Sequence, residues 1–507
     1  MDIKILLLVI FFAIMIFIGF YARRHATNIG DFVLGGRAVG PWLTAFAYGT
    51  TYFSAVVFVG YAGQFGWKYG LSATWIGIGN AVLGSLLAWL VLGRRTRIMT
   101  HHLNSTTMPE FFGSRYDSKA LRIAAAAITF IFLVPYTASV YNGLSRLFSM
   151  AFDIPYEICI VGMAVLTGVY VVLGGYMATA INDFVQGIIM LIGIVVVIAS
   201  VLNQNGGFMA AVNSLAQFNS DAAPTLGQPG AYSSFFGPDP INLVGVLILT
   251  SLGTWGLPQM IHKFYAIKNE KAIKAGTVIS TVFALVIAGG SYFLGGFARL
   301  YDSDAIRTAS GSIAFDAIVP AMLSNLSDLL IGIVVVLVLS ASMSTLASLV
   351  MTSSSTLTLD LIKGNIVKNI SEKKQLFIMR ILIGLFIALS LVFAIKPPTF
   401  IAQLMSISWG ALAGSFLAPF IYGLYWKRVT KAAVWASFAT GIGITLSNLF
   451  LKYISSSINA GALAMIAGLV VVPLVSLITP KLSKEKIKEI FNCYEESTGN
   501  QNKKIAA

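Results

Sequence analysis

The chain has 507 residues, of which 57% are hydrophobic and only 11% charged, and its mean hydropathy is +0.82. Soluble domains carry about 25% charged residues, so this composition excludes a soluble globular protein and predicts an all-α integral membrane protein. The net charge of +14 does not indicate a nucleic-acid partner, because the basic residues fall in short clusters between apolar segments, as topology signals do.

Thirteen apolar segments follow one another along the chain, each long enough to cross a lipid bilayer. The first has no clear cleavage site after it, so we expect it to be retained as a helix. The ninth exceeds one straight span, so we expect it to tilt or to continue beyond the membrane. The segments cover residues 3–22, 42–65, 71–93, 120–147, 156–175, 182–202, 241–262, 275–298, 328–360, 377–395, 399–425, 431–451 and 460–479.

The basic residues predict the orientation of these segments. Placing the amino terminus outside and the carboxyl terminus in the cytoplasm puts 27 of the 34 Lys and Arg residues, Lys263 included, on the cytoplasmic side. Basic loops are held on that side of a cell membrane. Residues 203–240 contain no Lys or Arg, so we expect them to form an external loop.

Two of the segments contain residues that interrupt a helix. Residues 47–55 (AYGTTYFSA) are small, hydroxylated and β-branched, and residues 252–259 (LGTWGLPQ) contain two glycines and a proline. An interrupted helix is tolerated in lipid where it lines a cavity. The two interruptions open two sets of five segments, and paired broken helices in inverted repeats are typical of secondary transporters. The alternative is that Gly and Pro are common in all spanning helices.

The ninth segment carries hydroxyl groups at Ser344, Thr345 and Ser348, which the three- and four-residue spacing places on adjoining parts of one helical face. Such oxygens suit a hard cation, but hydroxyls also hold helices together in membranes. Asp183, at the start of the sixth segment, is either a helix cap or a cation or proton ligand.

Several short motifs, in this order and spacing, make the sequence similar to the solute:sodium symporter family over about residues 31–480. That family includes bacterial proline and pantothenate carriers. The motifs are DFVLGGR at residues 31–37, PEFF at 109–112, RY at 115–116, GGY at 174–176, NDFVQG at 182–187, MSTL at 343–346 and GLYW at 423–426.

The resemblance implies a LeuT-type fold with an inverted five-plus-five repeat. It also implies a sodium site between the broken second segment and the ninth. The five sodium ligands it implies are the carbonyls of Thr50, Phe53 and Ala341 and the hydroxyls of Ser344 and Thr345.

A second sodium position of some family members is matched by Asp183 and Ser348, but the hydroxyl expected at 347 is replaced by Ala347. The proline carriers have an Asp where this chain has Tyr52. The missing carboxylate predicts a lower sodium affinity or a changed ion selectivity.

The resemblance also implies a solute site. Tyr136 matches a substrate-site tyrosine of the proline carriers, whereas residues 256–258, 154–157 and 396–398 are closer to the pantothenate carriers. Both solutes bear a carboxylate, so we expect a small carboxylate-bearing solute such as proline, pantothenate or a monocarboxylate. The candidate solute-binding residues are Tyr52, Ser54, Tyr136, Thr254, Trp255 and Pro258.

The sequence therefore predicts a sodium-coupled symporter of the plasma membrane that works by alternating access and is not an enzyme. Sodium and a small solute are its expected partners in the lipid bilayer, with no organic cofactor. A proton-coupled transporter of the same fold and a membrane sensor without transport are the alternatives. The expected parts are residues 1–40 (first helix and connector), 41–426 (transport core, made of 41–202, the loop 203–240, and 241–426), 427–480 (two further helices) and 481–507 (cytoplasmic tail).

Overall fold

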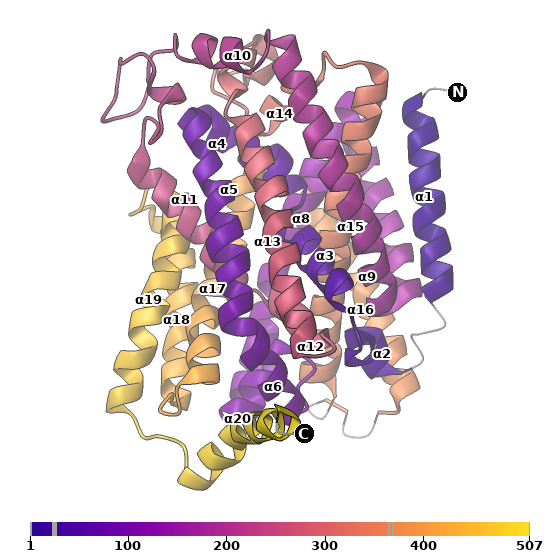
Figure 1. Ribbon diagram of the computed structural model, residues 1–507, viewed down its shortest axis with the longest axis vertical. Coiled ribbons are helices and arrows are strands. Elements are labelled where there is room, and N and C mark those ends of the chain that lie inside the picture. The colour runs from indigo at the N-terminus through magenta and orange to yellow at the C-terminus, as the bar shows by residue number, and fades with distance from the viewer. Residues whose placement is uncertain (1–2, 23–27, 364–365, 368–369, 506–507) are drawn as a thin grey trace.

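A computed structural model describes residues 3–22, 28–363, 366–367 and 370–505, and most of them lie in helices that run along one bundle (Figure 1). The first helix, α1 (Ile3–Ala22), begins at one end of the bundle, and the last, α20 (Lys484–Ile505), lies at the other (Figure 1). The helices that run along the bundle in one piece are α8 (Lys119–Phe152), α13 (Glu270–Gly295), α15 (Asp328–Thr356), α16 (Glu372–Ile395), α17 (Ile401–Tyr425), α18 (Lys431–Leu451) and α19 (Ser457–Ile478).

The chain reverses direction at Gly70, between the second and third predicted segments. Before it, α3 (Pro41–Tyr52), η3 (Val56–Tyr61) and α4 (Ala62–Tyr69) run parallel to α13, since Gly49 contacts Phe283 and Gly66 contacts Gly295. After it the chain runs back along the same helix, because Gly77 contacts Gly289. Gly70 has φ +60°, and a Cβ there would collide with the backbone of Tyr232, so only glycine suits this turn. The returning elements are η4 (Gly70–Ala73), α5 (Thr74–Gly79), η5 (Asn80–Leu87), η6 (Trp89–Gly93) and α6 (Arg94–His102).

The helix α9 (Tyr156–Gln204) is a second place where one continuous stretch holds two spans. Its 49 residues would reach about 74 Å as one helix, more than twice the hydrocarbon thickness of a bilayer. Gly175 breaks it with φ 59° and ψ −165°, so the two halves match the fifth and sixth predicted segments.

A third interruption divides the seventh predicted segment. The helix α11 (Pro240–Leu252) leads through η8 (Gly253–Trp255) into α12 (Pro258–Ala266), and the two parts are bent by 41°. Leu257 is extended (φ −83°, ψ 122°) and Pro258 is the first residue of α12, a position at which proline costs no helical hydrogen bond.

Among the described residues, ten helices are long and apolar enough to cross a membrane, and eleven if this bent pair counts as one span. Thirteen crossings therefore stay a prediction. The central helices are α17 and α15, whose apolar windows are 89% and 83% buried, whereas those of α1 and α16 are only 22% and 28% buried. The outer helices expose large apolar side chains such as Phe17, Phe450 and Ile478, as contact with lipid requires.

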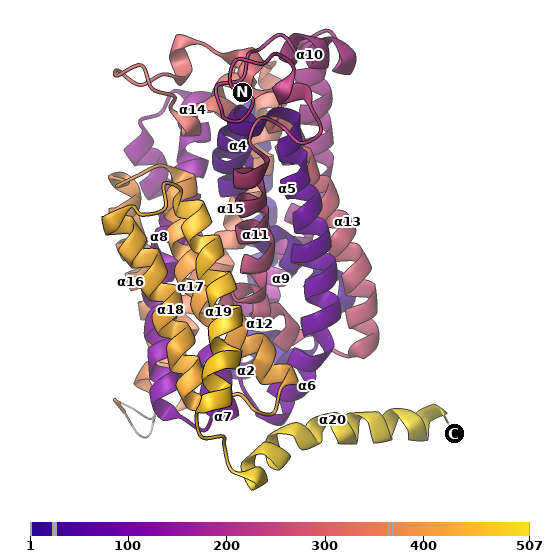
Figure 2. The same ribbon diagram turned by 90° about the vertical axis from the view of Figure 1, so that its left-hand side faces the viewer.

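The two ends of the bundle differ in charge. One end, here called the basic end, carries Arg94, Arg95, Arg97 and the short helices α2 (Ile29–Leu34), η2 (Gly35–Arg37) and α7 (Met108–Arg115). The helix α20 lies crosswise below this end (Figure 2). The opposite end carries α10 (Phe208–Leu215) and α14 (Phe315–Leu323) (Figure 1). We expect the basic end to be cytoplasmic.

Candidate functional site

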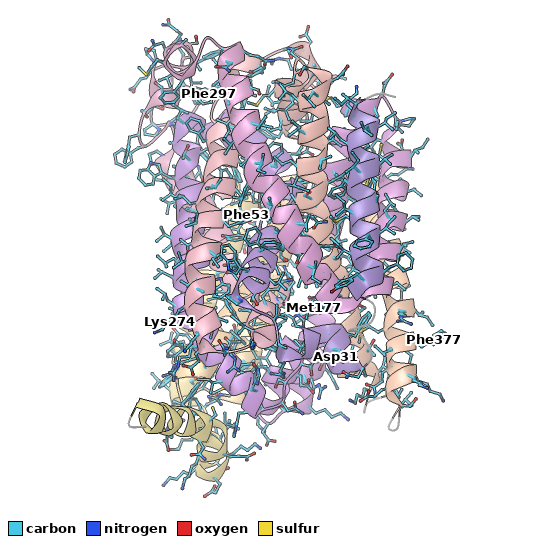
Figure 3. All side chains as sticks on the ribbon, turned by 45° about the vertical axis from the view of Figure 1, so that its right-hand side comes forward. Asp31, Phe53, Met177, Lys274, Phe297 and Phe377 are labelled. Carbon is cyan, nitrogen blue, oxygen red and sulfur yellow. The ribbon has the colours of Figure 1, made fainter. Side chains whose placement is uncertain are left out.

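The break in α3 lies near the middle of the bundle. Figure 3 shows Phe53 about midway between Phe297, near one end, and Lys274, near the other. Phe53 ends α3 with φ −111° and ψ 104°, and Ser54 Oγ accepts a hydrogen bond from the Val56 amide where the helix resumes. A helix that ends leaves its last carbonyls without helical partners. The break therefore presents backbone oxygens at mid-depth.

Hydroxyl groups of α15 meet these carbonyls. Ser344 Oγ lies 3.1 Å from both Thr50 O and Ala341 O, and it donates to Ser340 O within α15 at 3.0 Å as well. Thr345 Oγ1 lies 3.2 Å from Thr50 O and 3.1 Å from Ala341 O. Four of the five expected sodium ligands are thus gathered in one cluster.

The fifth expected ligand, Phe53, stands at the edge of this cluster. Phe53 and Ala341 both line one small, mostly apolar cavity, together with Ser54 and residues of α9 and α13. Sodium is a hard cation that prefers oxygen ligands, and carbonyl and hydroxyl oxygens on a broken helix and its neighbour are a suitable donor set. The residues present therefore fit a sodium ion.

The two residues expected at a second ion position, Asp183 and Ser348, also lie near each other, but a third residue stands between them. Lys263 of α12 donates to Ser348 Oγ at 2.9 Å, and its Nζ is 3.9 Å from Asp183 Oδ2. The Lys263 side chain is buried, so counting it among the cytoplasmic loop residues was wrong. The sequence missed it because it follows an apolar segment directly, where a basic residue normally marks topology.

Two of the three aromatic residues expected to bind the solute, Tyr52 and Tyr136, gather around a tryptophan that the sequence did not indicate. The Tyr52 ring stacks on Phe53 at 4.2 Å and faces Trp409 at 6.3 Å, and the Tyr136 ring meets Trp409 edge-on at 5.9 Å. All these side chains are buried. Trp409 fits because Gly253 has no side chain: a Cβ at Gly253 would collide with the indole ring.

The other expected solute residues hold the broken helices in place. Thr254 Oγ1 donates to Gly84 O at 3.0 Å, and Trp255 Nε1 donates to Leu83 O at 2.9 Å, so both fasten η8 to η5. Pro258 begins α12, and Ser54 supports the restart after α3. Of the six candidates, Tyr52 and Tyr136 face the aromatic cluster.

Buried hydrogen-bonding groups without a partner stand around the same cluster. Within the described part of the chain, Asn80 Nδ2, Tyr292 Oη, Trp409 Nε1 and Tyr61 Oη are buried and make no hydrogen bond. Buried polar groups are normally paired. All four carry an N–H or O–H donor, and the Trp409 ring packs against both Tyr52 and Tyr136, which suits a ligand with acceptor oxygens.

A cavity of about 510 Å³ opens at the opposite end of the bundle from the basic end. It is lined by Gln64, one turn from Tyr61 on the same helix, and by Lys68 and Arg299. Arg299 donates to Asp221 Oδ2 at 2.7 Å. Burial favours a raised pKa for Asp221, but hydrogen bonds from Tyr232 and Arg299 and the charge of Arg299 outweigh it and lower the pKa.

A bundle of apolar helices with two broken helices that meet at mid-depth defines a secondary transporter of the membrane. The family follows from the sequence: the chain matches the Sodium:solute symporter family over residues 32–441 and belongs to it. It is 29% identical over 503 residues to a sodium/proline symporter of Staphylococcus aureus, a match that covers 95% of this chain and 93% of that protein. The chain is thus a multi-pass membrane protein and a transporter.

Two solved structures share the fold. A Na+-coupled sialic acid symporter, described as substrate-bound and outward-open, superposes with a TM-score of 0.76 at 16% identity, covering 95% of this chain and 99% of that one. Mhp1, a nucleobase-cation-symport-1 family transporter in a closed conformation, gives a TM-score of 0.52 at 11% identity, covering 90% of this chain and 97% of that one. The all-α, LeuT-type membrane fold implied by the sequence is confirmed, whereas the repeat boundaries stay predictions.

Proposed function

We propose that the protein imports a small carboxylate-bearing solute, such as proline, pantothenate or a monocarboxylate, together with sodium by alternating access. The observation that carries this proposal is the cluster of carbonyl and hydroxyl oxygens where α3 breaks against α15. It lies beside the aromatic cluster around Trp409, so an ion and a solute could bind as neighbours. The relative named a sodium/proline symporter supports the same pairing.

Sodium would bind to the carbonyls of Thr50, Phe53 and Ala341 and to the hydroxyls of Ser344 and Thr345. Each hydroxyl can rotate so that its lone pairs face the ion, because it already lies next to the carbonyls that would share it. The ion would fasten the broken α3 to α15 and so favour one arrangement of the two helices. Coupling follows because the ion binds the two conformations with different affinity.

The solute would bind among Tyr52, Tyr136 and Trp409. The unpaired donors of Asn80, Tyr292 and Trp409 offer hydrogen bonds to carboxylate oxygens, and the aromatic faces offer apolar contact. A membrane potential of 100 mV, negative inside, adds about 2.3 kcal/mol per translocated charge, roughly fiftyfold in accumulation.

The same proposal assigns parts and orientation. Residues 41–202 and 241–426 would form the two inverted halves of the transport core, residues 427–480 two helices outside it, and residues 481–507 a cytoplasmic tail. The amino terminus would face outward, which makes the cavity of about 510 Å³ the external entrance, and the membrane would be the plasma membrane.

Uptake by the purified protein in liposomes tests the proposal. We expect an inward sodium gradient to drive accumulation of labelled proline, pantothenate or a monocarboxylate, and matched potassium and proton gradients to leave the label at equilibrium. Accumulation driven by protons alone would replace sodium by the proton as the coupling ion. No accumulation of any of the three under any gradient would contradict the proposed solute class.

A further inference from the structure

Lys263 places a positive charge inside the bundle, between α12, α15 and α9. Its side chain is buried, although lysine is almost never fully buried without a partner. The ammonium group lies 2.9 Å from Ser348 Oγ on α15, 3.9 Å from Asp183 Oδ2 on α9, and 5.3 Å from the centre of the Tyr176 ring. One side chain of α12 thus touches polar groups of two other helices.

The buried carboxylate of Asp183 requires the positive charge of Lys263 to balance its own charge. Its carboxylate is fully buried and accepts no hydrogen bond from any residue that the structure describes. Burial of an unpaired carboxylate is strongly unfavourable. Within the described residues, Lys263 is the cation that lies within ion-pair distance of Asp183.

These residues do not fit a second sodium ion, although the family resemblance directs attention to them. Ala347 offers no side-chain oxygen, so the oxygens left for an ion are the Asp183 carboxylate and the hydroxyls of Ser348 and Thr51, which only removal of the Lys263 ammonium would free. Ser348 Oγ already accepts from that ammonium and lies 2.9 Å from Thr51 Oγ1. A sodium ion bound to Ser348 would lie next to the ammonium group. Two positive charges at such a short distance repel each other strongly in a buried site.

We propose that the ammonium group of Lys263 takes the place of a second sodium ion, so that the carrier binds one sodium. The tethered cation neutralises Asp183 and joins α12 and α9 to α15. Lys263 is also connected to the proposed sodium site through Ser348 and Thr51. The Thr51 hydroxyl contacts Ser348, and the Thr51 carbonyl accepts a hydrogen bond from Thr345 at 3.3 Å. The inference rests on the proposed sodium site for its first ion.

Counting bound sodium tests this assignment. Purified full-length protein in detergent is equilibrated with ²²Na+, with choline balancing the ionic strength, and bound ions are counted per protein. We expect one ion for the wild type, one for Lys263→Arg, two for Lys263→Ala, and one again for Lys263→Ala combined with Asp183→Asn. Asp183→Asn alone should still bind one ion, because Asp183 is not a ligand in the wild type.

The outcomes separate this inference from the proposed function. Two ions on the wild type, with one lost in Asp183→Asn, would overturn the tethered cation while leaving the symporter intact. A monodisperse Lys263→Ala protein that still binds one ion would overturn it too. No sodium on the wild type at any concentration up to 500 mM would instead contradict the sodium site itself. If Lys263→Ala does not fold, the wild-type and Asp183→Asn counts still decide the matter.

Discussion

Two carboxylates are fully buried among the residues that the structure describes, and their surroundings differ. Asp360, at the basic end in η11 (Leu357–Ile362), accepts from Arg122 Nε and from Thr107 Oγ1, both at 2.6 Å. Asp183, in the second half of α9, accepts no hydrogen bond among the described residues, and its cation, Lys263, is 3.9 Å away. The first group is saturated with hydrogen bonds, and the second is held by charge alone.

The regions around them also differ in what their polar groups contact. At the basic end, Arg97 donates to Ile267 O at 2.9 Å, Arg37 to Ser105 O at 2.7 Å and Arg115 to Gly423 O at 2.7 Å. At mid-depth, unpaired groups such as Trp409 Nε1 face the proposed binding site. Each of these bonds joins elements that are remote in sequence and so stabilises the basic end, although Arg37 Nη1 and Arg115 Nη1 make no hydrogen bond there. In the proposed function, the unpaired groups at mid-depth meet the solute.

The largest expected effect on stability comes from breaking the hydrogen-bond network of Asp360. Arg122→Ala removes the guanidinium that lies 2.6 Å from the buried Asp360 carboxylate, and removing one partner of a buried pair costs about 3–5 kcal/mol. We expect a much lower melting temperature in detergent, at any sodium concentration. In Lys263→Ala, by contrast, we expect added sodium to restore much of the lost stability.

A matched control is Arg307→Ala, since Arg307 pairs with Asp302 in an exposed ion pair at 2.7 Å. Exposed pairs contribute about 0–1 kcal/mol, so its melting temperature should stay near that of the wild type. An equal loss in both variants would mean that the Asp360 network is no stronger than a surface pair.

The next effect concerns the oxygen cluster at the α3 break. Ser344→Ala with Thr345→Ala removes two of the five proposed ligands, and we expect the sodium concentration for half-maximal uptake to rise at least about tenfold, equivalent to about 1.4 kcal/mol. Ser342→Ala is the control, because Ser342 Oγ donates within α15 to Val338 O. Unchanged sodium dependence in a well-expressed double variant contradicts the site.

A smaller effect should separate the solute from the ion. Trp409→Phe keeps an aromatic ring but removes the unpaired N–H, so we expect the KM for the solute to rise about fivefold to tenfold, the value of one hydrogen bond. Half-maximal sodium should stay unchanged at saturating solute. Trp89→Phe is the control, because it also loses an unpaired N–H, from a ring that packs against Tyr48 and Phe264. The KM of this variant should stay near that of the wild type.

Much of the fold could be predicted from the sequence, because the hydropathy of a local stretch of residues identifies a membrane span. The breaks at Phe53 and near Pro258 were also predictable, since the residues that interrupt a helix are local. The number of crossings is harder to derive from hydropathy. Residues 56–102 form one nearly continuous helical stretch, and the reversal at Gly70 rests on contacts with α13.

The site was predicted less completely, for a physical reason. The hydroxyls of α15 follow helical spacing, so their common face could be read from the chain. Lys263 and Trp409 could not be placed in this way, because their partners are remote in sequence: Lys263 meets Ser348, and Trp409 meets Tyr136. Only packing of distant helices turns a basic residue after an apolar segment into a buried cation.

The smallest expected effect concerns the end of the bundle opposite the basic end. Asp316 of α14 accepts from the Ile401 amide at 3.2 Å and so joins α14 to the start of α17. Burial raises the pKa of Asp316 to about 6, although the bond from Ile401 and the charge of Arg146 oppose this. The folded state therefore retains this proton when the unfolded chain, with a pKa near 3.9, has lost it.

The sign follows from linkage: the free energy of unfolding falls as the pH rises from about 4 to 6 and then levels off. Asp316→Asn keeps an acceptor oxygen for Ile401 without the charge, so its melting temperature relative to the wild type should be higher by about 1–2 °C at pH 7 than at pH 4.5. Asp304→Asn, an exposed change at the same end, should show no such shift. An equal difference in melting temperature between Asp316→Asn and the wild type at both pH values would mean that the Asp316 carboxylate stays ionised in the folded protein. Hydrogen bonds would then hold this buried acid, as they hold Asp360 at the basic end.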